Sequence, residues 1–223
     1  MRHFAVVIGF VLALGTAFSQ QHDIGSIPPG FTSIFNHQNI AGWHVSMTTH
    51  QGNTREWRVI DDVLTARQSP KGNGGVLLSD KRYKDFEVYL EIKPDWGCDG
   101  GLFLRSNGAG QAYQVMIDYL EGENVGGIYG ERLEGVQLTR SKGWKEVWRK
   151  DDWNALRARI TGNPPHITVW LNGKKITDFQ DTVNHAAGGA KDGMVAVQVH
   201  SGTRWGGEES FHRFRNIAVK ELQ

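Results

Sequence analysis

The sequence is poor in cysteine, and this shortage limits how the chain can be stabilised. Cys98 is the only cysteine among 223 residues, so no disulfide can form within the chain. A chain of this kind must hold its fold with a buried apolar core. A nucleophilic role for Cys98 is the weaker alternative, because no histidine lies near it in the sequence to activate the thiol. We therefore interpret Cys98 as structural.

An excess of charge of one sign is also missing. The chain contains 25 lysine and arginine residues against 24 aspartate and glutamate residues, which gives a formal net charge of +1. Nucleic-acid-binding domains carry a basic patch or stripe that attracts phosphates. The balanced charge therefore predicts no nucleic-acid partner.

Long apolar runs are absent except near the N-terminus, at residues 4–14. This run is too short to span a bilayer, which needs about 20 apolar residues. Arg2 precedes it and the small-residue site Ala17-Phe-Ser19 follows it, so residues 1–19 are predicted to be a cleaved secretory signal. We expect export to a bacterial periplasm or to the cell exterior, a short linker at residues 20–29, and no membrane contact after cleavage.

Several signatures of metal and nucleophilic catalysis are missing as well. The chain has no His-Glu-x-x-His, no P-loop and no Gly-x-Ser-x-Gly. His44, His50 and His212 do not have the spacing of zinc ligands. The acidic pairs Asp61-Asp62 and Asp151-Asp152 are more typical of turns than of calcium ligands. We predict no cofactor, with a divalent metal such as Ca²⁺ as the open alternative.

Short alternating runs and 28 glycines make up most of the chain, whereas helical periodicity is nearly absent after the signal. In residues 86–92, apolar and polar side chains alternate, as in a half-buried strand. Asn172-Gly173 predicts a type I′ hairpin, because both central residues need positive φ. We predict an all-β fold, a two-sheet antiparallel jelly-roll sandwich that forms a single domain over residues 30–223. Strands are expected near residues 57–60, 63–67, 75–79, 86–92, 99–105, 113–118, 126–131, 156–160, 167–171, 195–200 and 211–219, with a short helical turn near residues 143–148.

Two of the predicted strands carry polar residues on one face. Gln114, Met116 and Asp118 share a face, because alternate residues of a strand point the same way. Gln198 and His200 share a face of a later strand. If the two strands are neighbours, an amide pair lies beside an Asp–His pair. Amides suit sugar hydroxyls, and Asp118 or His200 could then act as general base while the other orients it.

Arg105 is the candidate for stabilising negative charge that develops on a substrate oxygen. Each charged candidate also has a structural alternative. Asp118 could end a strand at a turn, His200 could sit at a loop edge, and Arg105 could pair with Asp99 or Asp118. The functional interpretation requires that the side-chain tips of Asp118, Gln198, His200 and Arg105 cluster within about 10 Å in one pocket.

Tryptophans outside the alternating runs point to a class of ligand. Indole rings stack on the apolar faces of sugars, so exposed tryptophans suit a carbohydrate ligand. We expect Trp144 and Trp205 to be the first to reach a ligand. The alternative is that such residues close the ends of the sandwich.

Eight short motifs together resemble one known family. In order, they are Gly30-Phe-x-x-Ile-Phe-Asn36, Ala41-Gly-Trp43, Gly100-Gly-Leu-Phe-Leu-Arg105, Tyr113-Gln-Val-Met-Ile-Asp118, Gly127-Ile-Tyr129, Trp153-Asn154, Trp170-Leu-Asn-Gly173 and Phe214-Arg-Asn-Ile217. Their order and spacing resemble the 3-keto-disaccharide hydrolase domain, also described as 3-keto-glucoside lyase/hydratase. The resemblance implies a concanavalin-like jelly roll, export from a bacterial cytoplasm, and a small carbohydrate substrate already oxidised at C3.

The resemblance also implies a reaction. A C3 ketone acidifies the proton on C2, so a base can remove it, the C1 substituent can leave, and water can add back. Such a site needs a base near C2, a cation or hydrogen-bond donor near O3, and an acid near the glycosidic oxygen. A divalent metal could take the place of the cation near O3. The residues that fit are Asp118 or His200 as base, Arg105 at O3, and Tyr129 or Glu131 as acid, with Gln114, Gln198 and Tyr113 as further sugar contacts.

One departure from the family pattern leaves the function open. Related domains commonly read Tyr-Glu-x-Gln where this chain has Tyr113-Gln114-Val115-Met116. Gln114 cannot serve as a base, so either Asp118 and Glu131 carry the role or the protein only binds sugar. The first hypothesis is an exported enzyme that cleaves 3-keto-glycosides. The alternatives are a non-catalytic carbohydrate-binding module and a laminin-G-like adhesion module.

Overall fold

The computed structural model describes residues 24–118, 120, 124–206 and 209–223. The predicted signal peptide, residues 1–19, lies outside this part of the chain. Within the described residues, helical structure is limited to two 3-10 turns, η1 (Trp144–Glu146) and η2 (Ala187–Gly189). The first confirms the helical turn predicted near residues 143–148. Neither turn is long or apolar enough to cross a membrane.

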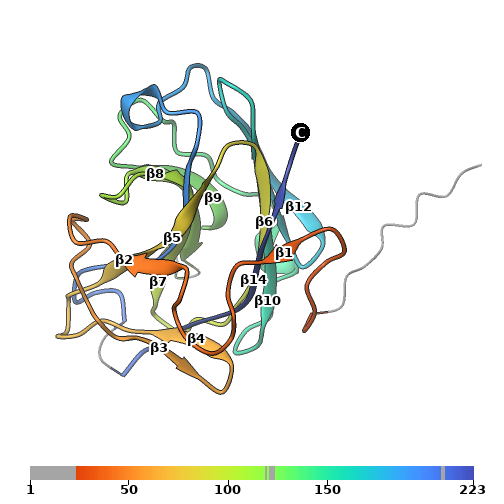
Figure 1. The fold of residues 1–223 in the computed structure, drawn as a ribbon. Helices are drawn as coiled ribbons and strands as arrows, with labels where there is room; N and C mark the ends of the chain where they lie inside the picture. The colour runs from red at the N-terminus through yellow and green to blue at the C-terminus, as the bar shows by residue number, and fades with distance from the viewer. Residues whose placement is uncertain (1–23, 119, 121–123, 207–208) are drawn as a thin grey trace, which may run out of the picture.

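Strands form the rest of the regular structure (Figure 1). They are β1 (Thr32–Ser33), β2 (Trp43–Val45), β3 (Trp57–Ile60), β4 (Val63–Ala66), β5 (Gly75–Tyr83), β6 (Phe86–Ile92), β7 (Asp99–Ser106), β8 (Ala112–Asp118), β9 (Val125–Glu131), β10 (Asn154–Thr161), β11 (His166–Leu171), β12 (Lys174–Gln180), β13 (Gly193–Val199) and β14 (His212–Glu221).

These strands form two sheets in which every pairing is antiparallel. The eight-stranded sheet has the order β12-β11-β10-β6-β14-β4-β3, with β1 beside β14. The six-stranded sheet has the order β2-β5-β13-β7-β8-β9. The sheets lie face to face across the main core (Figure 1). The predicted all-β, two-sheet antiparallel jelly-roll sandwich is confirmed.

The core between the sheets follows from the alternation in the sequence. Phe86, Val88, Leu90 and Ile92 of β6 are fully buried in the main hydrophobic cluster, as their period-2 spacing predicts. The hairpin between β11 and β12 turns at Asn172-Gly173, where φ is 48° and 84°. Both values are positive, as a type I′ turn requires.

The six-stranded sheet has a second, outer face that positions the candidate site. Tyr113, Val115 and Ile117 of β8 point into the core, so the alternate residues of β8 point outward. A small apolar cluster covers one part of this outer face and consists of Val76, Leu78, Phe103, Ala112, Met194 and Ala196. The segment between β2 and β3 reaches the β7–β8 turn, where Ser46 Oγ donates to the Gly108 carbonyl at 2.7 Å.

Candidate active site

A pocket of about 650 Å³ opens on the outer face of the six-stranded sheet. Its walls come from the segment after β2, from β7, β8 and β9, from the segment after β9, and from the residues that follow β13. It is lined by His50, Gln51, Asp99, Gln114, Met116, Tyr129, Gly130, Glu131, Arg132, Leu133, Glu134, His200 and Ser201. Acids, imidazoles and amides therefore meet in one cavity.

An amide pair lies on the floor of this pocket. β8 and β13, possible neighbours from the sequence, are not adjacent, because β7 lies between them. The amides still meet, since Gly101 of β7 has no side chain to separate them: a Cβ there would lie 2.5 Å from Gln114 Nε2. Gln114 Nε2 donates to Gln198 Oε1 at 3.0 Å and to the Gly100 carbonyl at 3.3 Å. Gln198 is fully buried, so only Gln114 faces the pocket.

His200 and Asp99 form the first acid–base pair of the pocket. The Nδ1 of His200 lies 2.5 Å from the Ser201 carbonyl oxygen, which can only accept a hydrogen bond. This contact places a proton on Nδ1, so Nε2 is the nitrogen that a neutral His200 ring presents as a base. Nε2 lies 3.8 Å from Asp99 Oδ2, a carboxylate that can stabilise the imidazolium once Nε2 takes a proton. Trp205 packs on His200, with 4.4 Å between ring centroids.

Glu131 and His50 form the second pair. Glu131 Oε1 lies 2.9 Å from His50 Nε2, and the carboxyl is nearly buried. Burial raises the pKa of Glu131, although Gln51 and Arg132 oppose the shift. The pKa of His50 is lowered by burial and by the positive charges of Arg132 and His200. Both shifts favour the neutral form of each group over the charged pair.

The rim of the pocket is polar and exposed. Tyr129 of β9 is 45% exposed. It pairs in register with Gln114 of β8, so both side chains lie on the outward face of the sheet. Arg132 and Glu134 are exposed on the segment after β9. Among the residues that the structure describes, no ion pair holds the Arg132 guanidinium. Arg132 is therefore available as a cation for a ligand oxygen.

Asp118 lies outside the pocket, contrary to its expected role as base. It ends β8, it is 1% exposed, and its Oδ1 accepts the Leu120 backbone N–H at 3.0 Å. Asp118 therefore ends the strand as a buried residue, and a strand end was the structural alternative. Asp99 pairs with Asp118 in register on β7 and lines the pocket in its place.

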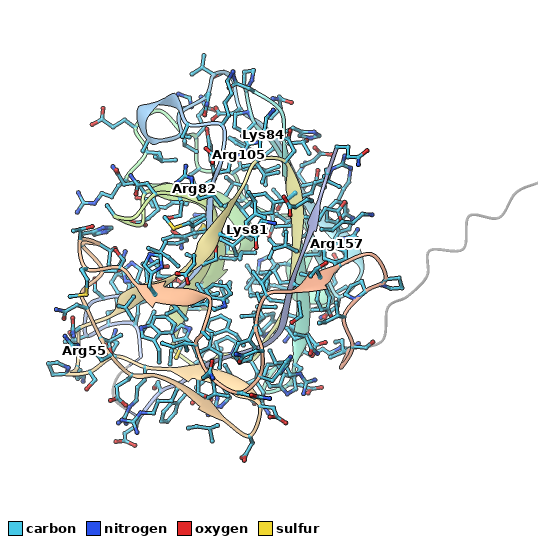
Figure 2. The ribbon with its side chains drawn as sticks, viewed as in Figure 1. Arg55, Lys81, Arg82, Lys84, Arg105 and Arg157 are labelled. Carbon is cyan, nitrogen blue, oxygen red and sulfur yellow. The ribbon has the colours of Figure 1, made fainter. Side chains whose placement is uncertain are left out.

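Arg105 lies at the far end of β7, so the predicted clustering with His200 is wrong. Six residues of strand separate it from Asp99, which is about 20 Å at the usual rise. Its side chain is fully buried and donates to the Lys84 carbonyl at 2.7 Å, the Gly162 carbonyl at 3.1 Å and Asp85 Oδ1 at 2.8 Å. Figure 2 shows Arg105 beside Lys84, at the turn between β5 and β6. This is a structural ion pair.

Two aromatic candidates also point away from the pocket. Tyr113 faces the core, where its hydroxyl donates to Asp181 Oδ2 at 2.7 Å and accepts the His185 backbone N–H at 2.9 Å. Trp144 is buried in the main core beside Trp148, with ring centroids 6.3 Å apart. Both side chains pack in the core. For Trp144 this agrees with the structural alternative, in which tryptophans close the ends of the sandwich. Of the two predicted tryptophans, Trp205 alone touches a pocket residue, His200.

Two further kinds of chemistry would depend on metal-ligating side chains and on the single thiol of the chain, Cys98. No group of three or more His, Cys, Asp or Glu side chains is arranged to hold a metal ion within residues 24–118, 120, 124–206 and 209–223. Cys98 is buried, and burial raises the pKa of its thiol to about 12. A thiol with so high a pKa is not a nucleophile near neutral pH.

Sequence reasoning missed His50, Gln51 and Asp99 as pocket residues. Asp99 carried a usable signal, because an antiparallel pairing of two neighbouring strands places it on the same face as Gln114. His50 and Gln51 lie in an irregular segment without periodicity. Their contacts join residues about 80 and 150 positions apart, which no local pattern encodes.

Comparison with known proteins agrees with this architecture. A family model described as the 3-keto-alpha-glucoside-1,2-lyase-like domain matches residues 30–220. A search of curated proteins finds no match.

Solved structures share the fold at low sequence identity. A candidate glycosyl hydrolase from Parabacteroides distasonis has a TM-score of 0.60 at 21% identity, covering 86% of this chain and 99% of that one. The β-glucanase of Bacillus licheniformis has a TM-score of 0.59 at 12% identity, covering 87% and 99%. The carbohydrate-binding module CBM66 of Bacillus subtilis has a TM-score of 0.52 at 16% identity, covering 81% and 96%. These likenesses establish the jelly roll, and the family match identifies the chain as a member of the 3-keto-alpha-glucoside-1,2-lyase-like domain family.

Proposed function

We propose that this protein is an enzyme that cleaves 3-keto-glycosides by removing the C2 proton, eliminating the C1 substituent and adding water. The observation that carries the proposal is the presence of two acid–base pairs in one pocket. His200 Nε2 lies beside Asp99, and Glu131, whose pKa is raised by burial, lies beside His50. Family membership supports the same substrate class.

The proposed reaction begins at C2. His200 Nε2 takes the C2 proton, and the electron pair of the C2–H bond forms an enolate with the C3 ketone. Asp99 stabilises the imidazolium, while Arg132 stabilises the negative charge on O3. Arg132 thus takes the role first given to Arg105.

Elimination and hydration complete the cycle. The enolate collapses to a C1=C2 double bond, the C1–O bond breaks with its electron pair, and Glu131 protonates the departing oxygen. Water then adds to C1 and a proton returns to C2, which gives free 3-keto sugar. Net consumption is one water molecule per bond cleaved.

The first experiment compares two substrates. Purified protein is incubated with a 3-keto-glucoside and with the same glucoside before oxidation, and sugar release is followed by chromatography. Release from the oxidised substrate alone is expected, because only the C3 ketone makes the C2 proton acidic. Equal release from both glucosides, or release from the unoxidised one alone, would contradict the elimination route.

A non-catalytic carbohydrate-binding module is the second candidate. Gln114 and Met116 on the pocket floor favour it, since neither can act as an acid or a base. Calorimetric binding of a 3-keto-glucoside without any product after prolonged incubation would support this candidate over the enzyme.

Export remains part of the proposal and rests on residues 1–19 of the sequence. Expression of the full chain in a Gram-negative bacterium, followed by fractionation and N-terminal sequencing, tests it. A periplasmic product that begins near residue 20 is expected, whereas an uncleaved cytoplasmic product would contradict export.

A further inference from the structure

The Gln51 amide connects the two acid–base pairs of the pocket. Gln51 is 1% exposed and lies in the segment between β2 and β3. Its Oε1 accepts the backbone N–H of Ser201 at 2.9 Å, directly after His200. Its Nε2 lies 3.4 Å from Glu131 Oε1 and 3.1 Å from His50 Nε2. One buried side chain therefore touches the segment that carries the base and both members of the other pair.

The orientation of this amide is fixed by its partners. A backbone N–H can only donate, so the contact with Ser201 identifies the amide oxygen of Gln51. The NH₂ group therefore faces both members of the pair, 3.4 Å from Glu131 Oε1 and 3.1 Å from His50 Nε2.

We propose that Gln51 is a positioning residue that holds Glu131 and His50 together and fixes that pair relative to His200, so that acid and base face the same substrate. The inference rests on the proposed function of the pocket. Gln51 itself contacts no reacting atom. Its role is to set where Glu131 stands and to keep the pKa of Glu131 below the value that burial alone would give.

The charged and titratable groups around Glu131 determine how the loss of Gln51 would change the pKa of Glu131. His50 faces Glu131 from the segment after β2, Arg132 and Glu134 flank the pocket on its own segment, and His200 and Asp99 lie on the other wall. The Gln51 hydrogen bond lowers the pKa of Glu131 against the effect of burial. Its removal should therefore raise that pKa further.

The test uses two substitutions of Gln51. Gln51→Met keeps the length of the side chain and removes its three hydrogen bonds, to Ser201, Glu131 and His50. We expect kcat to fall about 10- to 100-fold with little change in KM, since a hydrogen bond to an ionisable group is lost. The high-pH limb of the rate profile should move to higher pH, because Glu131 keeps its proton longer. Gln51→Glu should recover activity at low pH only, where the introduced carboxyl is protonated and can both donate to Glu131 and accept from Ser201.

Gln68 supplies a matched control. It is equally buried, and its Nε2 donates to the carbonyls of His200, Gly202 and Trp205 at 2.7–3.0 Å, whereas its amide is not bonded to Glu131 or His50 within the described part of the chain. Gln68→Met should lower the melting temperature and leave the high-pH limb in place. If Gln68→Met and Gln51→Met move the limb equally, the role of Gln51 is only to hold the segment.

A readout that does not need turnover separates this inference from the proposed function. The pKa of Glu131 can be followed by ¹³C NMR of the labelled carboxyl, assigned with Glu131→Gln. An upward shift in Gln51→Met supports the positioning role even if no 3-keto-glycoside is cleaved. An unchanged pKa together with an unchanged rate profile would overturn it.

Discussion

The two ends of strand β7 carry charged residues that look equally suited to catalysis in the sequence, yet they do opposite things in the structure. At one end, Asp99 lines the pocket and faces His200 Nε2 across 3.8 Å. At the other end, Arg105 is fully enclosed and its guanidinium is held by Lys84, Gly162 and Asp85. The first end borders an open cavity, whereas the second is filled by protein.

The difference teaches how to separate a functional charge from a structural one. Arg105 gives its donors to fixed protein acceptors, so a substrate would have to displace the Asp85 carboxylate and two carbonyls. The pocket that Asp99 lines instead contains His50 and Glu131, and burial lowers the pKa of the first and raises the pKa of the second. Substitutions at the two ends should therefore separate activity from stability.

The largest effect is expected at the acid of the pocket. Glu131→Gln keeps the shape of the side chain and removes the proton donor, so kcat should fall by about 10²- to 10⁴-fold, the usual contribution of a general acid. Stability at pH 7 should stay level or rise slightly, because a buried carboxyl is no longer there to be ionised. The measurement is steady-state release of sugar together with a thermal melt. An undiminished kcat would remove Glu131 from the mechanism.

At the other end of β7, Arg105→Met should have the reverse result. Breaking a buried ion pair leaves Asp85 without its partner and costs about 3–5 kcal/mol of unfolding free energy. Activity per folded molecule should be kept, because Arg105 lies far from the pocket. Urea unfolding and an assay at low temperature measure the two quantities. A loss of kcat in the folded variant would support the role predicted from the sequence, in which Arg105 stabilises negative charge on a substrate oxygen.

The fold was largely predictable from the sequence, because strand alternation is a local signal. Residues 86–92 bury alternate side chains, and Asn172-Gly173 turns a hairpin, both as predicted. The sequence also predicted that Gln114 and Gln198 point away from the core. Their strands are not adjacent, and the two amides bond across Gly101 of the intervening strand β7 because this residue has no side chain.

The candidate site was only partly predictable, because long-range contacts complete it. His200, Glu131, Gln114 and Tyr129 line the pocket, as the strand faces and the family resemblance suggested. Arg105 adopts a positive φ of 52° at an irregular point of β7, so simple alternation does not give its direction. Asp118 lies at the end of β8, where strand alternation no longer predicts burial.

Stability should depend on pH at the Asp99 end of β7. His212 is buried beneath Gly100, and burial lowers its pKa to about 4. Between pH 6.5 and 4 the unfolded chain binds a proton that the folded chain does not, so the free energy of unfolding should fall as pH falls. The loss is at most about 3 kcal/mol, at 1.36 kcal/mol per pKa unit.

His212→Phe provides the control for this titration, because it keeps an aromatic ring stacked near Phe214. Urea unfolding of both proteins at about pH 7 and about pH 4.5 measures the effect, since this interval spans most of the histidine titration. The variant should lose less stability than the parent over this interval. Equal losses would show that another group is responsible.

A smaller effect is expected from the two aspartates that face each other across β7 and β8. Asp99→Asn should lower kcat by about 10-fold, since it removes the charge that stabilises the His200 imidazolium. Asp118→Asn is the matched variant, because it pairs with Asp99 in register but lies outside the pocket. Its kcat should stay near that of the parent. Steady-state rates that fall more in Asp118→Asn than in Asp99→Asn would reverse the assignment.

The most direct test of the central claim follows the hydrogen on C2. A 3-keto-glucoside is cleaved in D₂O, and the released sugar is analysed at once by mass spectrometry and NMR, with an enzyme-free sample as the control for spontaneous exchange. The account predicts one deuterium at C2 for each bond cleaved, because His200 removes the original proton and solvent returns another. A product that keeps its original hydrogen at C2 would contradict the account.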